Sequence, residues 1–408
     1  MDSRGHPGRF AVAVALAAIG IVMVAVTRFD IATVLKEVMG ALGIASVAGG
    51  GLVSTIPALG DGITEPFMGR LADVVRRRHI MALGIFIYSA FTLLTGLATN
   101  LFTIGLFRFF VGVGEGMYIP SYFSFLGSAF HTRRGFFIGI LGGLFTVGTA
   151  LSPIGTAHFY LAFGHSWPAP FIIFGLIGLV LAGLVALVGR SGFYDGRVAG
   201  DHPPFRVADL LSRNMLMITV MMLLWGLTNA GFIGMYTLYL RHVGLTLSQA
   251  ALIASICGWA AFATSCLGGW LSDQIGRRNT LLIFGFAALL SAYPLFVVTH
   301  SFWPALILGA IFQGSNGTYF PVGVAYAQDN AHGGSLGVHT GTVVGLGHIV
   351  AGFSGAVIGW CINAGGFPAV SYLYLASSAV MLAAVLVSRD HRYLAKKVMP
   401  AGLAAEEG

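Results

Sequence analysis

Long apolar runs separated by short polar loops dominate this sequence, and the pattern predicts a polytopic membrane protein. Asp, Glu, Lys and Arg are absent from several long intervals, including 135–189, 279–328 and 330–388. A helix that crosses the hydrocarbon core needs about 20 apolar residues, so each of these intervals can hold two spans. The runs divide into twelve predicted spans: 10–36, 45–68, 80–99, 102–128, 136–160, 169–189, 214–240, 247–270, 280–299, 303–328, 336–362 and 369–388.

The runs predict helices rather than barrel strands. Only helices and closed barrels satisfy every backbone polar group in lipid, and these runs lack the alternation of barrel strands. The predicted fold class is therefore all-α, with twelve transmembrane helices in two halves. The predicted domains are an N-terminal six-helix bundle (1–189), a cytoplasmic linker (190–213), a C-terminal six-helix bundle (214–390) and a cytoplasmic tail (391–408).

Composition narrows the function classes. The 408 residues are 56% hydrophobic and 9% charged, whereas a soluble domain carries about 25% charged residues. A soluble enzyme is excluded, and no catalytic, metal-ligating or cofactor-binding cluster is predicted. The net charge is +7, but the basic residues sit in loops between spans, which argues against nucleic acid as a partner.

The positions of Lys and Arg predict the orientation. With both termini in the cytoplasm, 18 of the 22 Lys and Arg residues face inside, and only Lys36 and Arg241 face outside. Basic residues accumulate in cytoplasmic loops, so we expect an inner-membrane protein with cytoplasmic termini. The first apolar run is long and continues through Arg28, which indicates an uncleaved first span rather than a signal peptide.

The two halves resemble each other at a fixed offset. The segment Gly69-Arg-Leu-Ala-Asp73 recurs 200 residues later as Gly269-Trp-Leu-Ser-Asp273, and each copy is followed by arginines. The full motif, Gly-x-x-x-Asp-x-x-Gly-Arg-Arg, is the signature of the major facilitator superfamily, which this sequence resembles over nearly its whole length. The second copy matches fully, whereas Arg76 replaces the second glycine in the first. The resemblance implies two six-span halves with a substrate site between them near the midplane.

Charged groups in these loops can bond helix ends across the seam between the halves. Held bonds would favour the outward-open state, and broken bonds would permit inward opening. The alternative is that the arginines only obey the positive-inside rule. The predicted gating residues are Gly69, Asp73, Arg77, Gly269, Asp273, Arg277 and Arg278.

Charged side chains inside a membrane are costly and are functional hypotheses by default. The candidates, all in the N-terminal half, are Arg28, Asp30, Asp61, Glu65, Arg108 and Glu115. Arg108, Gly112 and Glu115 share one helical face, with a rise of about 10 Å from the first to the last. We therefore expect Arg108 and Glu115 to form an ion pair over Gly112, and protonation of Glu115 to free Arg108 for an anion.

The segment Arg-x-x-x-Gly-x-Gly-Glu-Gly around Arg108 is similar to the anion:cation symporter branch, which includes sialic acid, vesicular glutamate and galactonate transporters. This resemblance implies that Arg28 and Arg108 contact a substrate carboxylate and that Glu115 carries the proton. A Gly-Glu-Ala variant occurs in spinster-type lysolipid transporters, whose first span also carries an Arg-Phe pair like Arg28-Phe29. The sequence lacks the basic residue in span seven that some branch members use.

Three further acidic residues leave alternatives open. Asp30 is predicted to be a second proton site or a lipid-interface residue. Asp61 and Glu65 lie one turn apart, and two like charges that close cannot easily both ionise. They are predicted to relay protons, or else to serve packing or gating at the cytoplasmic end.

The matching positions of the C-terminal half are neutral, so we expect this half to shape the rest of the substrate site. The predicted contacts are Trp225, Asn229, Tyr236, Gln313, Asn316 and Tyr319; for the aromatic residues the alternative is packing or an interface belt. A stripe of glycines from Gly341 to Gly359 predicts close helix packing. His348 lies on this stripe and is assigned to packing rather than to the site.

Together these features predict a monomeric secondary transporter in the lipid bilayer that couples a small organic anion, a carboxylate, to protons by alternating access. The alternative is a spinster-like lysolipid or multidrug transporter.

Overall fold

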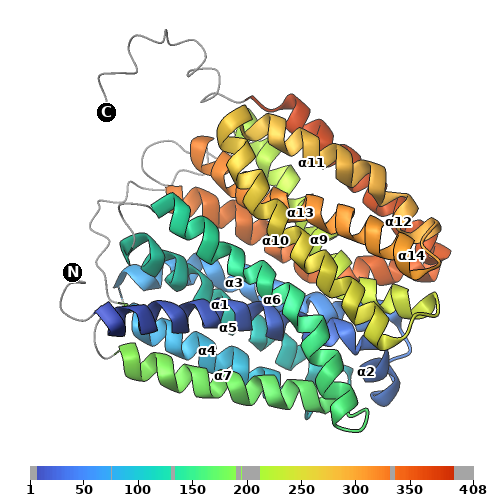
Figure 1. Cartoon of the computed structure of the whole chain (residues 1–408), viewed down its shortest axis with the longest axis horizontal. Helices are drawn as coiled ribbons and strands as arrows, with labels where there is room; N and C mark the ends of the chain where they lie inside the picture. The colour runs from blue at the N-terminus through green and yellow to red at the C-terminus, as the bar shows by residue number, and fades with distance from the viewer. Residues whose placement is uncertain are drawn as a thin grey trace.

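The computed structural model describes residues 7–74, 76–129, 134–189, 194, 212–330 and 336–389, and within them leaves undescribed the side chains at 7, 69–70, 72–74, 127–129, 134–142 and 336–340. The helices are α1 (Pro7–Thr33), α2 (Leu35–Ala41), α3 (Val47–Val74), α4 (Arg77–Thr95), α5 (Leu101–Ala129), α6 (Arg134–Ala162), α7 (Pro168–Gly189), α9 (Arg213–His242), α10 (Leu247–Ile275), α11 (Arg277–Ala292), α12 (Pro294–Val297), α13 (Phe302–Asn330) and α14 (Leu336–Val387) (Figure 1).

The predicted all-α fold with twelve spans is confirmed. α14 contains two spans, because the backbone leaves helical geometry at Gly365 and Gly366. Gly366 has a φ of 68°, a conformation that glycine adopts without a steric penalty, and Pro368 follows it at the start of the last span. Within the described residues, eight helices are long and apolar enough to cross a membrane on their own. The short helices α2 and α12 were not predicted.

Two helical groups pack around separate apolar clusters (Figure 1). In the first, α3 and α4 pack on α5, and α7 contacts α1 and α4. In the second, α10 and α11 pack on α13, and α14 packs on α9 and α11. The two groups meet where α3 contacts α14 and where α6 contacts α10. Most of the predicted linker and the whole predicted tail lie outside the described residues, so the domain boundaries stay predictions.

The glycine stripe brings α14 directly onto α3, which confirms its predicted packing role. A Cβ placed on Gly355 would collide with the backbone of Gly51, and one on Gly359 would collide with Ala48. The Thr55 hydroxyl donates to the carbonyl of Gly352 at 2.9 Å and accepts from Gly355 N–H at 3.1 Å. Small residues therefore let the two groups meet backbone to backbone.

At one end of the bundle, called the closed end below, the two groups bond to each other. Glu37 and Arg241 form an ion pair of 3.2 Å between the two groups, and the Ser54 hydroxyl donates to the carbonyl of Gly234 at 2.9 Å. An apolar cluster that includes Val53 of α3 and Phe232 of α9 fills the space beneath. The ends of α1 and α14 nearest the termini lie at the opposite end (Figure 1).

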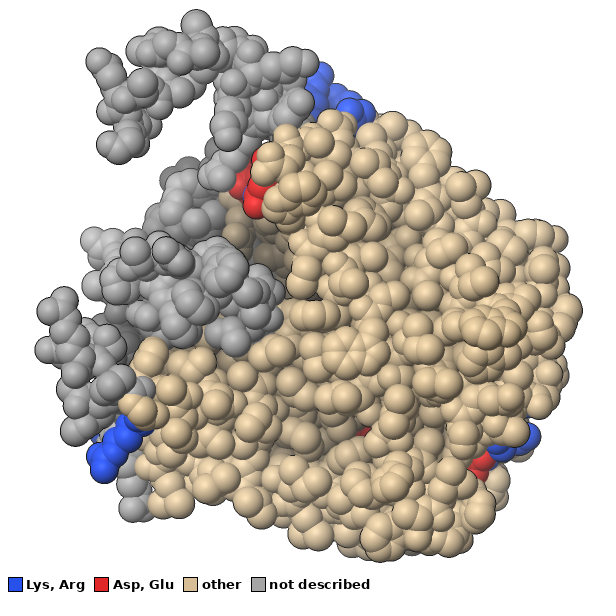
Figure 2. Space-filling view, viewed as in Figure 1, with Lys and Arg blue, Asp and Glu red and all other residues tan. Residues whose placement is uncertain are grey.

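The surface has the character of a membrane protein. On the face shown in Figure 2, the middle of the described surface is almost entirely free of Lys, Arg, Asp and Glu, and the charged side chains visible lie toward its margins. Because a bilayer disfavours charge at its centre, this distribution agrees with the predicted spans.

Candidate functional site in the membrane

A buried arginine bridges two carboxylates at the centre of the first group. Arg28 on α1 places Nη2 2.5 Å from Asp61 Oδ2 on α3 and 2.7 Å from Glu115 Oε2 on α5. Its Nε also donates to Glu115 Oε2 at 2.7 Å, and its guanidinium carbon lies 5.4 Å from the centre of the Phe145 ring. Three helices thus converge on one cation, and each of the three charged side chains is at least nine-tenths buried.

Arg108 forms a separate pair, which corrects one prediction. Its Nη1 lies 2.9 Å from Asp30 Oδ1 and donates to the carbonyl of Thr27 at 2.7 Å, while Nη2 donates to the carbonyl of Arg28. The predicted Arg108–Glu115 pair is therefore wrong. The reason is Gly112 between them: a Cβ there would collide with the carbonyl of Pro57, so α3 occupies the space that the pair would need.

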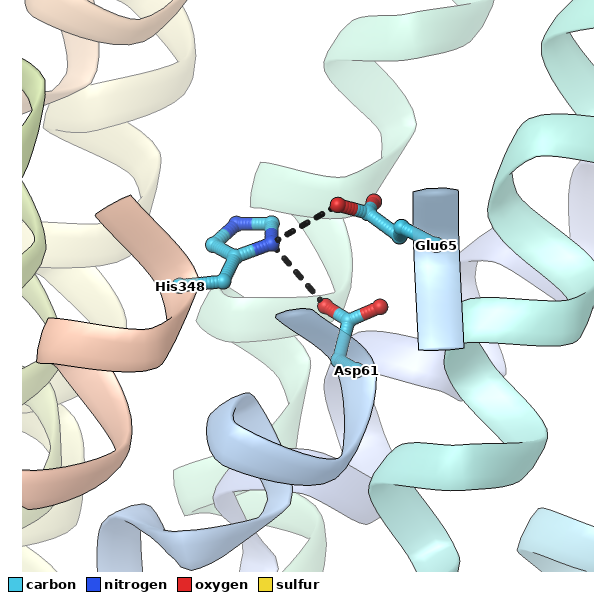
Figure 3. A group of neighbouring side chains, drawn as sticks. All are labelled: Asp61, Glu65 and His348. Atoms are coloured by element: carbon cyan, nitrogen blue, oxygen red, sulfur yellow. Dashed lines mark ion pairs between the residues drawn. The ribbon is translucent and has the colours of Figure 1, made fainter. Parts of the chain in front are cut away.

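The second group adds a residue that the sequence interpretation missed. His348 on α14 points its Nδ1 at Asp61 Oδ2, 3.2 Å away, and at Glu65 Oε2, 3.3 Å away (Figure 3). Asp61 and Glu65 lie one turn apart on α3, as predicted, and face the seam. The sequence did contain a signal for this contact. Two carboxylates buried together need a positive charge nearby, and His348 is an ionisable residue in the middle of a span.

Among the described residues, Asp61, Glu65 and His348 form the one group whose donor atoms lie close enough together to hold a metal ion, within 4.8 Å of one another. The guanidinium of Arg28 already rests on Asp61, and its positive charge opposes a second cation at the same carboxylate. We therefore interpret the three side chains as an ion-pair cluster, called the seam cluster below.

Two aromatic rings from the second group enclose the imidazole. The ring centres of Trp225 and Phe320 lie 6.3 and 6.4 Å from that of His348. Trp225 is fixed in turn, because its indole N–H donates to the carbonyl of Asn316 at 3.0 Å. The predicted site residues Trp225 and Asn316 therefore support the seam cluster from the side of α9 and α13.

Three other predicted residues gather near a small cavity between the groups. Gln313 donates to the side-chain oxygen of Asn229 at 3.1 Å. Gln313 and Tyr236 line a cavity of about 20 Å³ together with Phe29 and Thr33. This volume suits about one water molecule, so at this level the described conformation is closed to a larger ligand.

Tyr319 lies apart from the seam, contrary to prediction. Its hydroxyl donates to the carbonyl of Leu281 on α11 at 3.4 Å, and a Cβ on Gly285 would collide with the same hydroxyl. Six residues at 3.6 per turn place Tyr319 about 120° around α13 from Gln313. The two side chains consequently face different helices.

The sequence matches the Major Facilitator Superfamily over residues 10–247 and 216–402, which together span most of the chain. The chain belongs to the major facilitator superfamily. It is accordingly an integral membrane transporter rather than an enzyme.

Relatives and solved structures agree with this assignment. An MFS-type transporter of Gibberella moniliformis is 26% identical over 329 residues, covering 77% of this chain and 76% of the relative. The sialic acid transporter NanX of Escherichia coli is 25% identical over 256 residues, covering 61% of this chain and 62% of that transporter, which is less than two thirds of its length. The crystal structure of a bacterial homolog of the human lysosomal transporter Spinster, inward-facing and unoccupied, has a TM-score of 0.71 at 17% identity and covers 93% of this chain and 95% of that one.

The superfamily loops differ between the two halves in the way the sequence indicates. Gly276, the second glycine of the complete motif, has a φ of 92°, which favours glycine. Arg76 at the matching place has a φ of −59° and a ψ of 117°. The first loop therefore turns through an ordinary extended conformation where the second needs glycine.

Three of the predicted gating residues form bonds within their own half. Arg277 pairs with Asp273 and, at 3.3 Å, with Asp329 on α13. Arg278 donates to the carbonyl of Leu386 at 2.9 Å, and Arg77 donates to the carbonyl of Ser124 at 3.4 Å. The side chains of Gly69 and Asp73 lie outside the described residues. Gly269 has open space where a Cβ would stand. Bonds within one half do not hold the two halves together. The gating role therefore stays a proposal, and it applies to a state in which this end of the bundle is closed.

Proposed function

We propose that this transporter carries a small organic anion, of the carboxylate class, together with protons by alternating access. The observation that supports the proposal is the Arg28 guanidinium held by two carboxylates, Asp61 and Glu115, in the middle of the spans. A buried ion pair gives little net stability, so a purely structural purpose does not explain why three helices each place a charge there.

The arrangement explains why protons and anion would travel together. While Asp61 and Glu115 are both ionised, they occupy the donors of Arg28, and a substrate carboxylate is repelled by their negative charge. Protonating Glu115 removes one negative charge and releases guanidinium donors. An incoming carboxylate can then take the place of Glu115, because Arg binds carboxylates through two parallel N–H bonds. The proton and the anion together leave the charge of the site unchanged.

The seam between the halves offers the route for alternating access. With the termini in the cytoplasm, as the positions of Lys and Arg predict, the closed end described above faces outside. Rocking α3 away from α14 would open that end. The neutral side chains Trp225, Asn229, Gln313 and Asn316 are then proposed to contact the remainder of the substrate, with Arg28 binding its carboxylate.

The relative NanX is described as a sialic acid transporter, which supports a sugar acid as one substrate to test. A second candidate, a lysolipid or another hydrophobic compound, is favoured by the rings of Trp225 and Phe320 beside the seam cluster. These rings could pack on an acyl chain or an aromatic compound as well as on a sugar.

The test is uptake into proteoliposomes with a panel of sialic acid, galactonate, succinate and lysophosphatidylcholine. We expect one of the acids to accumulate when the lumen is more alkaline than the bath, and a protonophore to abolish the accumulation. Arg28→Ala should abolish binding and transport. Arg213→Ala is the matched control, because Arg213 is exposed at the start of α9.

Two outcomes would contradict the proposal. One is uptake of the acid at the wild-type rate by Arg28→Ala. The other is accumulation that does not change when the proton gradient is removed. Transport of lysophosphatidylcholine with none of the acids would establish the second candidate instead.

A further inference from the structure

The carboxylate of Asp61 is shared between two basic side chains that come from different halves of the protein. Its Oδ2 lies 2.5 Å from Nη2 of Arg28 on α1 and 3.2 Å from Nδ1 of His348 on α14. Arg28 belongs to the anion site proposed above, whereas His348 is at the seam. Asp61 therefore links the two directly, and the gain or loss of a proton by His348 alters the attraction between Asp61 and Arg28.

The seam cluster connects the C-terminal half to the buried ion pairs of the N-terminal half. Around His348, α3 contributes Asp61 and Glu65, α1 contributes Arg28 through Asp61, and α5 contributes Glu115 through Arg28. α9 and α13 present the uncharged rings of Trp225 and Phe320. The imidazole thus has both carboxylates and apolar rings as neighbours.

The buried carboxylates outnumber the buried arginines, so bound protons are needed to balance the charge. In the central part of the described spans, two arginines, Arg28 and Arg108, face four carboxylates, those of Asp30, Asp61, Glu65 and Glu115. An unpaired charge in such a site is strongly unfavourable. Protons on the carboxylates or on His348 must therefore balance the excess, and His348 lies between two of the carboxylates.

We propose that His348 is a second proton-binding residue of the transport cycle, and that its charged form holds α14 to α3 while drawing Asp61 away from Arg28. The inference rests on the proposed function, because the freed guanidinium is the one assigned to the anion. When the imidazole is charged, Asp61 and Glu65 both attract it across the seam, and the outer end of the bundle stays closed. When the proton leaves, the seam loses this attraction, and Asp61 returns fully to Arg28.

This mechanism can be tested without knowing the substrate. Spin labels at Ala45→Cys and Asn363→Cys, both exposed at the closed end, report the separation of α3 and α14 after Cys257, Cys266 and Cys361 are replaced. We expect acidification from pH 8.5 to pH 5.5 (about three units, or a thousandfold in proton concentration) to increase the fraction of molecules with the short distance. His348→Gln should remove most of this pH response, whereas His158→Gln, at an exposed position on α6, should keep it.

A second variant, Glu65→Gln, keeps the proposal testable if His348→Gln does not fold. Glu65→Gln removes one negative neighbour, so the imidazole binds its proton less tightly, and the midpoint of the response should move to lower pH by about one unit, a tenfold change in proton affinity. The number of protons moved per anion, measured from the reversal potential of the transported acid, should fall in His348→Gln.

A wild-type distance that is independent of pH, or a response that survives in His348→Gln, would overturn the inference. Loss of the response on adding EDTA would also overturn it, since a metal ion would then hold the cluster. A normal pH response in a protein that moves no acid would leave the His348 contact standing and defeat only the anion assignment.

Discussion

Arg108 and Asp30 form an ion pair of 2.9 Å that lies wholly inside the N-terminal half, with both side chains fully buried. The same guanidinium donates to the carbonyls of Thr27 and Arg28. Arg108 therefore fixes the backbone that carries Arg28, and we assign it a positioning role in place of the substrate contact that the sequence suggested.

This assignment predicts a loss of stability when the pair is broken. Arg108→Met leaves Asp30 buried without a cation, which costs about 3–5 kcal/mol in comparable cases, so the thermal unfolding midpoint in detergent should fall clearly. Adding Asp30→Asn to Arg108→Met should recover part of the loss, because the stranded charge is removed. Unchanged stability with loss of anion binding alone would restore the substrate role.

The spans and the glycine stripe could be predicted because each depends on residues of a single helix. The length of an apolar run fixes a span, and the spacing from Gly345 to Gly359 fixes a face. Partners on different helices could not be predicted in the same way. Arg108 and Glu115 share a face of α5, yet α3 packs over Gly112 between them, and each finds its partner on another helix.

The internal repeat gives no indication of the titratable residue in the C-terminal half. Matching the charged positions at a fixed offset gave only neutral residues, and the expectation followed that this half shapes the substrate site through neutral contacts. His348 has no counterpart among those positions, because it contacts Asp61 and Glu65 across the seam rather than by symmetry. His348 lies on the glycine stripe, and the stripe alone accounts for the contact between α14 and α3. Its position on the stripe therefore gave no separate reason to assign His348 a role.

Glu115 is predicted to couple transport to protons. Glu115→Gln keeps the shape of the side chain but holds it permanently neutral, as protonation would. We expect exchange of labelled for unlabelled acid to continue, while accumulation driven by a proton gradient is lost. Glu37→Gln is the control, because Glu37 pairs with Arg241 at the closed end of the bundle. Accumulation that persists in Glu115→Gln would assign the coupling proton elsewhere.

The packing of Gly355 against Gly51 predicts that a single methyl group disturbs the closed seam. In Gly355→Ala the new Cβ would collide with the backbone carbonyl of Gly51. Because the colliding atom belongs to the backbone, α14 and α3 would have to move apart. The closed state should lose population, seen as faster labelling of a cysteine at Thr55 from outside. Gly341→Ala on the same stripe has open space around its Cβ and should label at the rate of the unsubstituted glycine. Equal rates in the two variants would show that the closed state does not depend on this contact.

Asp329 is predicted to act with the superfamily loop. It lies 3.3 Å from Arg277, which also pairs with Asp273, and these side chains are partly exposed. Pairs of this kind contribute about 0–1 kcal/mol to stability, so Asp329→Asn should leave the thermal midpoint almost unchanged. If the loop sets the rate at which the inner end closes, the same variant should slow transport severalfold, as should Arg277→Gln. The double variant should then be no slower than Arg277→Gln alone, because that variant already removes the contact with Asp329. Rates that multiply in the double variant would instead show that Asp329 and Arg277 act independently.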